Sequence, residues 1–402
     1  MKIVGKDDAI QQNALDFQNT ENAFAHKSND ELRQSLRLFS LMNNPTLVNL
    51  GNQFAVKAIE WHLPFARYAI QKTLFKQFCG GTTLLNTNET VKMLAQYNTK
   101  TILDYGVEAK ESEEDFNATM VQNMRAIDFA AQSSGSIPFL SIKITGMVRS
   151  DLLMRIQNNS PLTLDEQNEY FNASKRVDAV CFHAREKNIS VLVDAEESWV
   201  QDTIDRIANI MMSRYNKERP IVYNTFQMYR HDRLAFLQKS FDTAVEKNYF
   251  LGAKLVRGAY MEKERKRAEE MNYATPINPD KVATDTMYNN GLVFCVQHHD
   301  RIASMNATHN AQSSKLLADL IEEMGIARNH PHFYFCQLYG MSDNITFNLA
   351  QAGYNVAKYL VYGAVEDVVP YLTRRAQENT SITGDMSREL ALLRTEAKRR
   401  GI

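Results

Sequence analysis

What the sequence has little of excludes several classes of protein. Only four of the 402 residues are cysteines, and none of them stands in a CxxC spacing. We therefore expect reduced cysteines in the core rather than disulfides or metal ligands. No run of 18 apolar residues occurs, so no transmembrane helix is predicted. Residues 1–8 contain no apolar segment, so no secretory signal is expected either.

Charge and short motifs are equally restrictive. The net charge is −1, so there is no general basic surface and no nucleic-acid partner is expected. The motifs GxGxxG after a strand, GxxxxGK[ST] and HExxH are absent, which argues against a Rossmann site, a P-loop and a zincin site. The histidines at 298–299 and 330–332 lack metal-ligand spacing with acids, so we interpret them as structural or solvated and predict no metal.

What the chain does contain is a regular alternation of β-rich and helical segments from residue 101 onwards. The β-rich runs are 101–108, 139–146, 189–196, 220–227, 251–260, 302–309, 332–338 and 355–361. Eight strand–helix repeats in about 260 residues are what a (β/α)8 TIM barrel requires, whereas a doubly wound sheet usually has fewer strands. The sequence therefore predicts an α/β barrel at 101–381, preceded by an N-terminal helical arm (1–100) and followed by a basic C-terminal tail (382–402).

Two segments outside this barrel have features that suit a surface contact. Residues 51–78 alternate aromatic and aliphatic side chains with lysines, a pattern found in helices that lie in a membrane interface. The same pattern also suits a helical arm that packs on the main domain. The tail carries Arg394, Lys398, Arg399 and Arg400. Both segments are candidates for a peripheral membrane or partner contact.

Polar side chains stand at the ends of the predicted strands. They include Glu108, Lys143, Asp194, Gln227, Lys254, Thr308, His309, Gln337 and Tyr359. Active sites of this barrel lie at the carboxyl ends of the strands. A set of acids, bases and amides at that end is difficult to explain by packing, so we predict a functional site there.

A polar helix face follows the last predicted strand. Tyr371, Arg374, Arg375 and Glu378 have the spacing i, i+3, i+4 and i+7, which puts them on one face. The two guanidinium groups form a fork suited to a carboxylate or phosphate. The alternative is a solvated face with an internal Arg–Glu pair, and the spacing alone does not separate the two.

The strand-end motifs together resemble one family, the flavin-dependent proline dehydrogenases. In chain order they are DYGVE (104–108), SIK (141–143), VDAEE (193–197), NTFQ (224–227), KLVRGAY (254–260), ATHN (307–310), QLYGM (337–341) and Tyr359 followed by YLTRRAQEN (371–379). The resemblance covers roughly residues 100–380. It implies a distorted barrel whose last helix lies over the mouth of the strands.

The reaction implied by this resemblance is oxidation of L-proline to Δ1-pyrroline-5-carboxylate. A hydride goes to N5 of a non-covalently bound FAD, and a membrane quinone then accepts the electrons. Because the chain ends soon after the last helix, the product is expected to pass to a separate pyrroline-5-carboxylate dehydrogenase. The basis of this chemistry is positioning of the ring carbon against the flavin.

The resemblance also assigns substrate residues. Arg374 and Arg375 would bind the proline carboxylate with help from Lys143. The ring would be enclosed by Tyr260, Leu338, Tyr359 and Tyr371. Tyr359 would crowd carbon 4 of the ring and so favour proline over 4-hydroxyproline. Glu108 would pair with Arg374 and gate the site.

Further residues are assigned to the cofactor by the same resemblance. Asp194 would belong to the polar network around the isoalloxazine ring. The other contacts would be Asn224, Gln227, Lys254, Val256, Gly258, Thr308, His309 and Glu378. Lys254 stands where bifunctional bacterial members often have arginine, and Met261 where many have tryptophan. Arg257 is interpreted as a structural cation.

Two rival functions stay open at this point. One is a hydroxyproline dehydrogenase or another cyclic imino acid oxidase of the same fold. The other is a barrel without catalysis that binds a ligand or protein, against which the set Lys143, Asp194, Arg374 and Arg375 argues. Because no transit peptide is evident, we expect a cytoplasmic enzyme of a bacterium, peripheral at the inner membrane.

Overall fold

The structure is a computed structural model that describes residues 15–44, 68, 70–106, 110–381 and 385–402, without the side chains of 376–386. Glu108, most of the arm at 51–78 and the side chain of Glu378 therefore lie outside the described part. Within these ranges no helix is long and apolar enough to cross a membrane.

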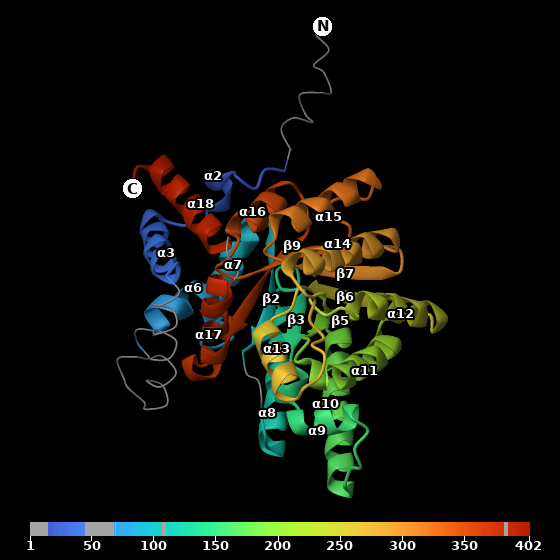
Figure 1. Cartoon of the computed structure of the whole chain (residues 1–402). Helices are drawn as coiled ribbons and strands as arrows, with labels where there is room; N and C mark the ends of the chain where they lie inside the picture. The colour runs from blue at the N-terminus through green and yellow to red at the C-terminus, as the bar shows by residue number, and fades with distance from the viewer. Residues whose placement is uncertain (1–14, 45–67, 69, 107–109, 382–384) are drawn as a thin grey trace.

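Eight parallel strands close into a barrel, which confirms the predicted fold (Figure 1). They are β2 (Thr99–Tyr105), β3 (Phe139–Ile142), β4 (Ser190–Val193), β5 (Val222–Gln227), β6 (Leu251–Val256), β7 (Ile302–Ala307), β8 (Phe333–Leu338) and β9 (Val356–Tyr362). Each strand pairs with the next, and β9 pairs with both β8 and β2, which completes the ring. An additional strand that the sequence did not predict, β1 (Cys79–Gly81), pairs with β9.

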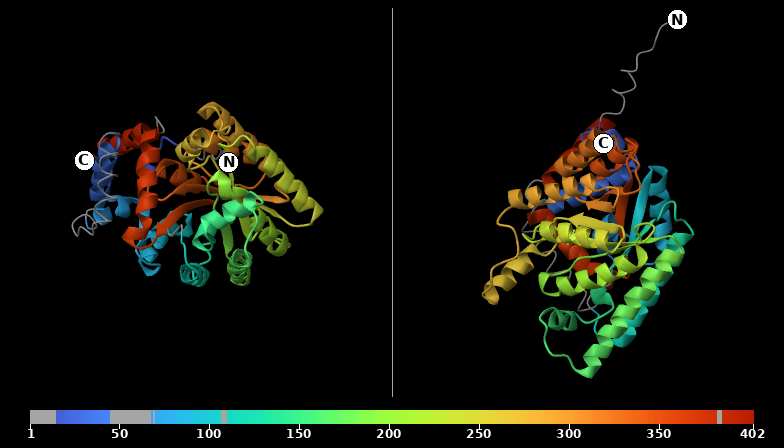
Figure 2. Two further views of the ribbon diagram at one scale, coloured as in Figure 1. Left: turned by 60° about the horizontal axis from the view of Figure 1, so that its bottom comes forward. Right: turned by 90° about the vertical axis from the view of Figure 1, so that its right-hand side faces the viewer.

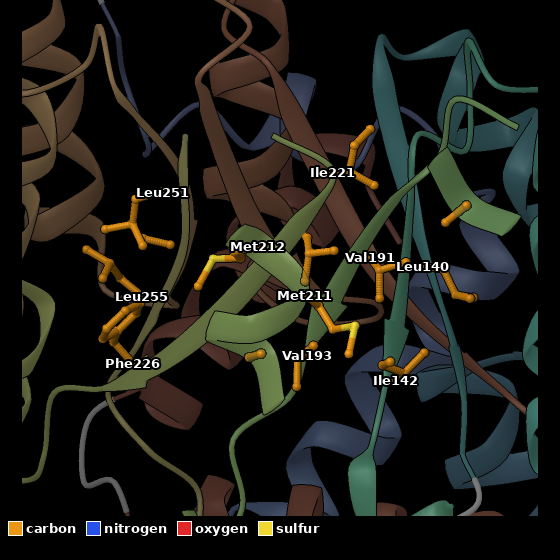
Figure 3. Close-up of a cluster of buried hydrophobic side chains, with 14 of the residues drawn as sticks. Leu140, Ile142, Val191, Val193, Met211, Met212, Ile221, Phe226, Leu251 and Leu255 are labelled. Atoms are coloured by element: carbon orange, nitrogen blue, oxygen red, sulfur yellow. The ribbon is translucent and has the colours of Figure 1, made fainter. Parts of the chain in front are cut away.

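The strands are apolar on both faces because helices cover the outside and side chains fill the inside. On β3 and β4, Leu140, Ile142, Val191 and Val193 point outward, and Met211 of α11 (Ser198–Tyr215) lies in the same buried cluster (Figure 3). The inward positions belong to a second cluster, which includes Phe139, Leu192 and Tyr223. All four cysteines are buried.

The covering helices alternate with the strands. They are α8 (Glu113–Ala131), α9 (Ser150–Gln157), α10 (Leu164–Glu186), α11, α12 (Arg233–Glu246), α13 (Met261–Glu270), α14 (Lys281–Gln297), α15 (Ala311–Glu323) and α16 (Asp343–Gln351). Several begin at a side-chain cap; Thr163, for example, forms a reciprocal capping box with Glu166. Helices α9 and α13 were not predicted. Figure 2 shows the ring from two further sides, with the long helices α8 and α10 side by side.

The first and last described helices pack together beside the barrel. The first hundred residues contribute α2 (Thr20–Ala23), α3 (Asn29–Met42), the π-helical turn Gln71–Phe75, α6 (Lys76–Phe78), the 3-10 turn Leu85–Thr87 and α7 (Asn88–Gln96). The predicted basic tail contains α18 (Asp385–Arg400), which packs against α3 and α2 (Figure 1). Arg399 and Arg400 are bound by Glu396, and Arg400 also donates to the carbonyls of Phe24 and Lys27. These two arginines are therefore engaged within the chain, which weakens the proposed membrane contact of the tail.

Helix α17 (Val365–Ser381) follows β9 and lies over the mouth of the barrel. Its residues Val365, Val368 and Tyr371 belong to the same buried cluster as the inward strand residues, not to the outer cluster. The approach is close, because a Cβ atom at Gly106 would come within 2.7 Å of Val368. The helix thus places its polar residues next to the carboxyl ends of the strands.

Candidate active site

Two acids and two lysines form a buried network inside the barrel, towards the carboxyl ends of the strands. Lys143 Nζ lies 3.0 Å from both carboxylate oxygens of Asp104 and 3.6 Å from Asp194 Oδ2. Lys254 Nζ lies 2.6 Å from Asp194 Oδ1. The four side chains come from β2, the end of β3, the end of β4 and β6. The network is electrically balanced, which is how buried charges are usually tolerated.

Asp194 is the centre of this network. It also accepts hydrogen bonds from Ser141 Oγ at 2.6 Å and from the Tyr359 hydroxyl at 2.7 Å. Burial alone would raise its pKa, but Lys254 and Lys143, with the hydrogen bond from Ser141, hold the pKa below its ordinary value. Asp194 is therefore a fixed carboxylate.

Asp104 is the residue that sequence reasoning missed. Burial raises its pKa, with Lys143 opposing and Asp194 adding to the increase. It stands in the DYGVE motif, and it is two residues after Ile102, which points into the barrel. Period-two alternation along the strand would therefore have placed it inside.

A cationic corner lies where β7 and β8 end. Arg257 donates to Thr308 Oγ1 at 2.6 Å and to Ser313 Oγ at 2.9 Å, and its Nε lies 2.7 Å from Asp285. His309 Nδ1 lies 2.9 Å from Ser342 Oγ. Burial, followed by the charges of Lys358, Arg375, Arg388 and Arg257, lowers the pKa of His309 to about 3. The imidazole is therefore neutral in a positively charged corner.

Helix α17 brings two of its predicted residues into this region. Tyr371 and Arg375 are each 8% exposed, and the Arg375 guanidinium lies 5.3 Å from the Tyr371 ring. Arg374 is half-buried. Leu338 and Tyr359 are paired across β8 and β9, so they are neighbours at the mouth. The alternative of a fully solvated face is thereby excluded for Tyr371 and Arg375.

The remaining cofactor candidates differ in where they lie. Gln227, at the end of β5, donates to the carbonyl of Glu196 at 2.7 Å. Val256 ends β6, and Gly258 and Tyr260 lie in the segment that follows it. Gly258 has φ +138°, and a Cβ there would come within 2.5 Å of the Tyr229 ring. Asn224 is not brought to the mouth, because its amide donates to Asp205 of α11 behind the sheet at 2.9 Å.

The chemistry of this donor set would suit a flavin dinucleotide. The corner around His309 contains cations and neutral donors of the kind that a diphosphate needs, and Lys254 and Asp194 are fixed polar groups of the kind that the ring would need. The described residues contain no group of three His, Cys, Asp or Glu side chains able to hold a metal ion.

The chain matches one family model and several known proteins. Residues 87–388 match the family model described as proline dehydrogenase. "Proline dehydrogenase 1, mitochondrial" of Caenorhabditis elegans is 34% identical over 338 residues, 82% of this chain and 54% of that protein. The protein of the same name from Drosophila melanogaster is 38% identical over 58% of this chain and 36% of its own length. "Hydroxyproline dehydrogenase" of Xenopus laevis is 31% identical over 97% of this chain and 91% of its own length.

Among solved structures, the chain is similar to proline utilization A of Bdellovibrio bacteriovorus, with a TM-score of 0.74 and 17% identity. The match covers 92% of this chain and 42% of that one. At this identity the likeness establishes the fold alone. The chain also spans only part of the length of the first two relatives above.

One prediction needs correction. A cytoplasmic bacterial enzyme was expected, but the relatives from Caenorhabditis elegans and Drosophila melanogaster are both named mitochondrial. The expectation relied on the lack of an evident transit peptide. Such peptides are amphipathic rather than apolar, so they leave a weak trace in a sequence.

Proposed function

The chain belongs to the proline dehydrogenase family, and on this premise we propose that it oxidises L-proline to Δ1-pyrroline-5-carboxylate with non-covalently bound FAD. The observation that carries the proposal is the balanced network of Asp104, Lys143, Asp194 and Lys254, together with the burial of Arg375 and Tyr371 on α17. A small zwitterion with an apolar ring needs such a combination of fixed charges and aromatic surface.

Substrate binding is assigned to α17 and the ends of β3, β6, β8 and β9. Arg374 and Arg375 bind the carboxylate as a planar fork, and Lys143 adds a third cation. Tyr371, Tyr359, Leu338 and Tyr260 enclose the ring. Because Asp104 and Asp194 already hold Lys143, its ammonium is positioned before substrate arrives, which reduces the entropy lost on binding.

Cofactor binding is assigned to the other side of the mouth. Lys254, Gln227, Val256, Gly258, Thr308 and His309 would hold FAD, which supplies the hydride acceptor when bound. Asp194 keeps Lys254 in place at 2.6 Å, so the ammonium has a fixed direction. We propose a quinone as the next electron acceptor and a separate dehydrogenase for the product. Glu108 as a gate and Glu378 as a flavin contact stay predictions, since these side chains lie outside the described part.

The test is optical. The purified protein should be yellow, with the absorption of an oxidised flavin, and should bleach anaerobically when L-proline is added. A colourless protein that does not take up added FAD would contradict the proposal. Flavin that binds but is not reduced by any cyclic imino acid would favour the non-catalytic barrel.

A second candidate is oxidation of 4-hydroxyproline. It is favoured by the match to a relative named hydroxyproline dehydrogenase, which covers 91% of that protein. Tyr359, which is buried, argues against it, because the family resemblance places this phenol against carbon 4 of the ring. Bleaching by trans-4-hydroxy-L-proline and not by L-proline would move the assignment to this candidate.

A further inference from the structure

Helix α18 reaches the barrel mouth with its first turns. Arg388 Nη2 donates to the carbonyl oxygen of His309 at 2.9 Å. Glu389, which is 8% exposed, accepts from the backbone N–H of Ser342 at 3.2 Å. The helix thus bonds the segments that follow β7 and β8, which are the two sides of the cationic corner.

Ser342 has a conformation that ordinary helix capping does not explain. It is the N-cap of α16, yet its φ is +51° and its side chain makes no cap hydrogen bond. A serine at this position normally uses its hydroxyl to accept from the first turn of the helix. Here the hydroxyl faces His309 Nδ1 at 2.9 Å instead. A strained backbone and an unused cap indicate that the contact with His309 has been favoured over local stability.

The contact determines which nitrogen of His309 carries the proton. The imidazole is neutral, so one ring nitrogen accepts and the other donates. Among the described residues Nδ1 is the one hydrogen-bond partner of the Ser342 hydroxyl, so the hydroxyl hydrogen has an acceptor there only if Nδ1 is unprotonated. Nδ1 therefore accepts, and Nε2 carries the hydrogen. His309 is then a neutral donor among the charges of Lys358, Arg375, Arg388 and Arg257.

We propose that Arg388, Glu389 and Ser342 are positioning residues that hold His309 as an Nε2–H donor to the bound cofactor. This inference rests on the proposed function, and it assigns α18 a part in cofactor binding. The helix is itself anchored, because Arg400 at its other end donates to carbonyls of Phe24 and Lys27. Retention of the cofactor is therefore coupled to the packing of the N-terminal helices.

The experiment compares FAD binding by apoprotein variants, followed by flavin fluorescence quenching, with the proline KM at saturating FAD. Ser342→Gly removes the hydroxyl and tolerates the positive φ, so the fold is preserved. Arg388→Met removes the bond to the His309 carbonyl. Each should raise the FAD Kd by roughly tenfold, the size of one hydrogen bond, and leave the proline KM within about twofold.

Two further variants separate positioning from general stability. Glu389→Gln keeps an oxygen that accepts from Ser342 and should retain the wild-type Kd, whereas Glu389→Leu should weaken FAD binding like Arg388→Met. Arg394→Met on the exposed side of the same helix is the matched control for Arg388→Met and should change nothing. If Ser342→Gly binds FAD as the wild type does, or Arg388→Met behaves like the control, the positioning role is wrong. If the variants give such a result while the wild type binds FAD and oxidises proline, the positioning role fails and the proposed function stays intact.

Discussion

The hydroxyl of Tyr359 donates a 2.7 Å hydrogen bond to Oδ2 of Asp194 inside the barrel. The Lys254 ammonium, which binds the other oxygen of the same carboxylate, lies 4.9 Å from the centre of the Tyr359 ring. The proposed selector of the substrate and the proposed cofactor residues are therefore parts of one buried network. A change at Tyr359 should affect both specificity and the state of Asp194.

Two substitutions at Tyr359 should separate these effects. Tyr359→Phe keeps the ring and removes the hydroxyl, so it should lower kcat/KM for proline by about tenfold, the size of one hydrogen bond to a charged group, without admitting 4-hydroxyproline. Tyr359→Ser removes the ring and should raise the ratio of hydroxyproline to proline turnover. Steady-state kinetics with both substrates measures this. Equal specificity ratios for Phe and Ser would contradict a steric selector.

Substitution of the two arginines of α17 tests whether they bind the substrate carboxylate. Arg375→Met should raise the proline KM by roughly ten- to hundredfold, because a charge-assisted contact to the substrate carboxylate is lost. Arg374→Met should act in the same direction. Bound flavin should stay at wild-type stoichiometry in both, measured by absorption of the purified proteins. Loss of flavin at an unchanged KM would mean that the helix face serves the cofactor instead.

Glu389 should make stability depend on pH. Burial, followed by the charge of Asp343, raises the pKa of Glu389 from 4.5 to about 7. A folded-state pKa above the unfolded value favours the protonated form in the fold. Its contribution is complete below pH 4.5 and is lost as the pH rises through about 7.

Glu389→Gln cannot ionise, so it should gain stability relative to the wild type as the pH rises. Between about pH 4 and pH 8 the difference in unfolding free energy should grow by about 3 kcal/mol in favour of the variant. Urea denaturation of both proteins in the same buffers measures it. Parallel curves for the two proteins would show that folding does not shift the pKa of Glu389.

The barrel was predictable because its strands leave a strong sequence signal. Strands covered on both faces are short apolar runs, and helical segments with an apolar side separate them, so all eight barrel strands were found. Strand β1 has three residues, Cys79–Gly81, and exists through its pairing with β9, which no local pattern reveals. Helix α13 is almost entirely polar and buries only Glu264 and Ala268, so it has no apolar stripe to recognise.

The site was predictable only in part, for a related reason. Polar residues at strand ends are visible in a sequence, but the face on which each lies depends on the exact register. Asp104 was missed although it points inward, and Asn224 was included although it bonds Asp205 behind β5. The links of α18 to His309 and Ser342 join residues about 50 to 80 positions apart through backbone atoms, which carry no sequence signature.

A buried ion pair of the barrel, Lys358 with Asp343, also binds the segment that precedes α3. Lys358 is 1% exposed, and its Nζ lies 2.8 Å from Asp343 Oδ1. His26 and Lys27 approach the other oxygen of Asp343 at 3.4 and 3.6 Å. The pair therefore joins β9, the start of α16 and the loop before α3.

Breaking this pair from one side should be costly, because it leaves a buried charge without its partner. Lys358→Met should lower the free energy of unfolding by about 3–5 kcal/mol, whereas Lys315→Met in the exposed pair with Asp319 should cost under about 1 kcal/mol. The double variant Lys358→Met with Asp343→Leu should lose less than the sum of the single changes, since neither charge of this pair is then buried without the other. Denaturant unfolding of the wild type, the three single variants and the double variant provides the comparison. Additive losses would mean that the two side chains stabilise the fold independently of each other.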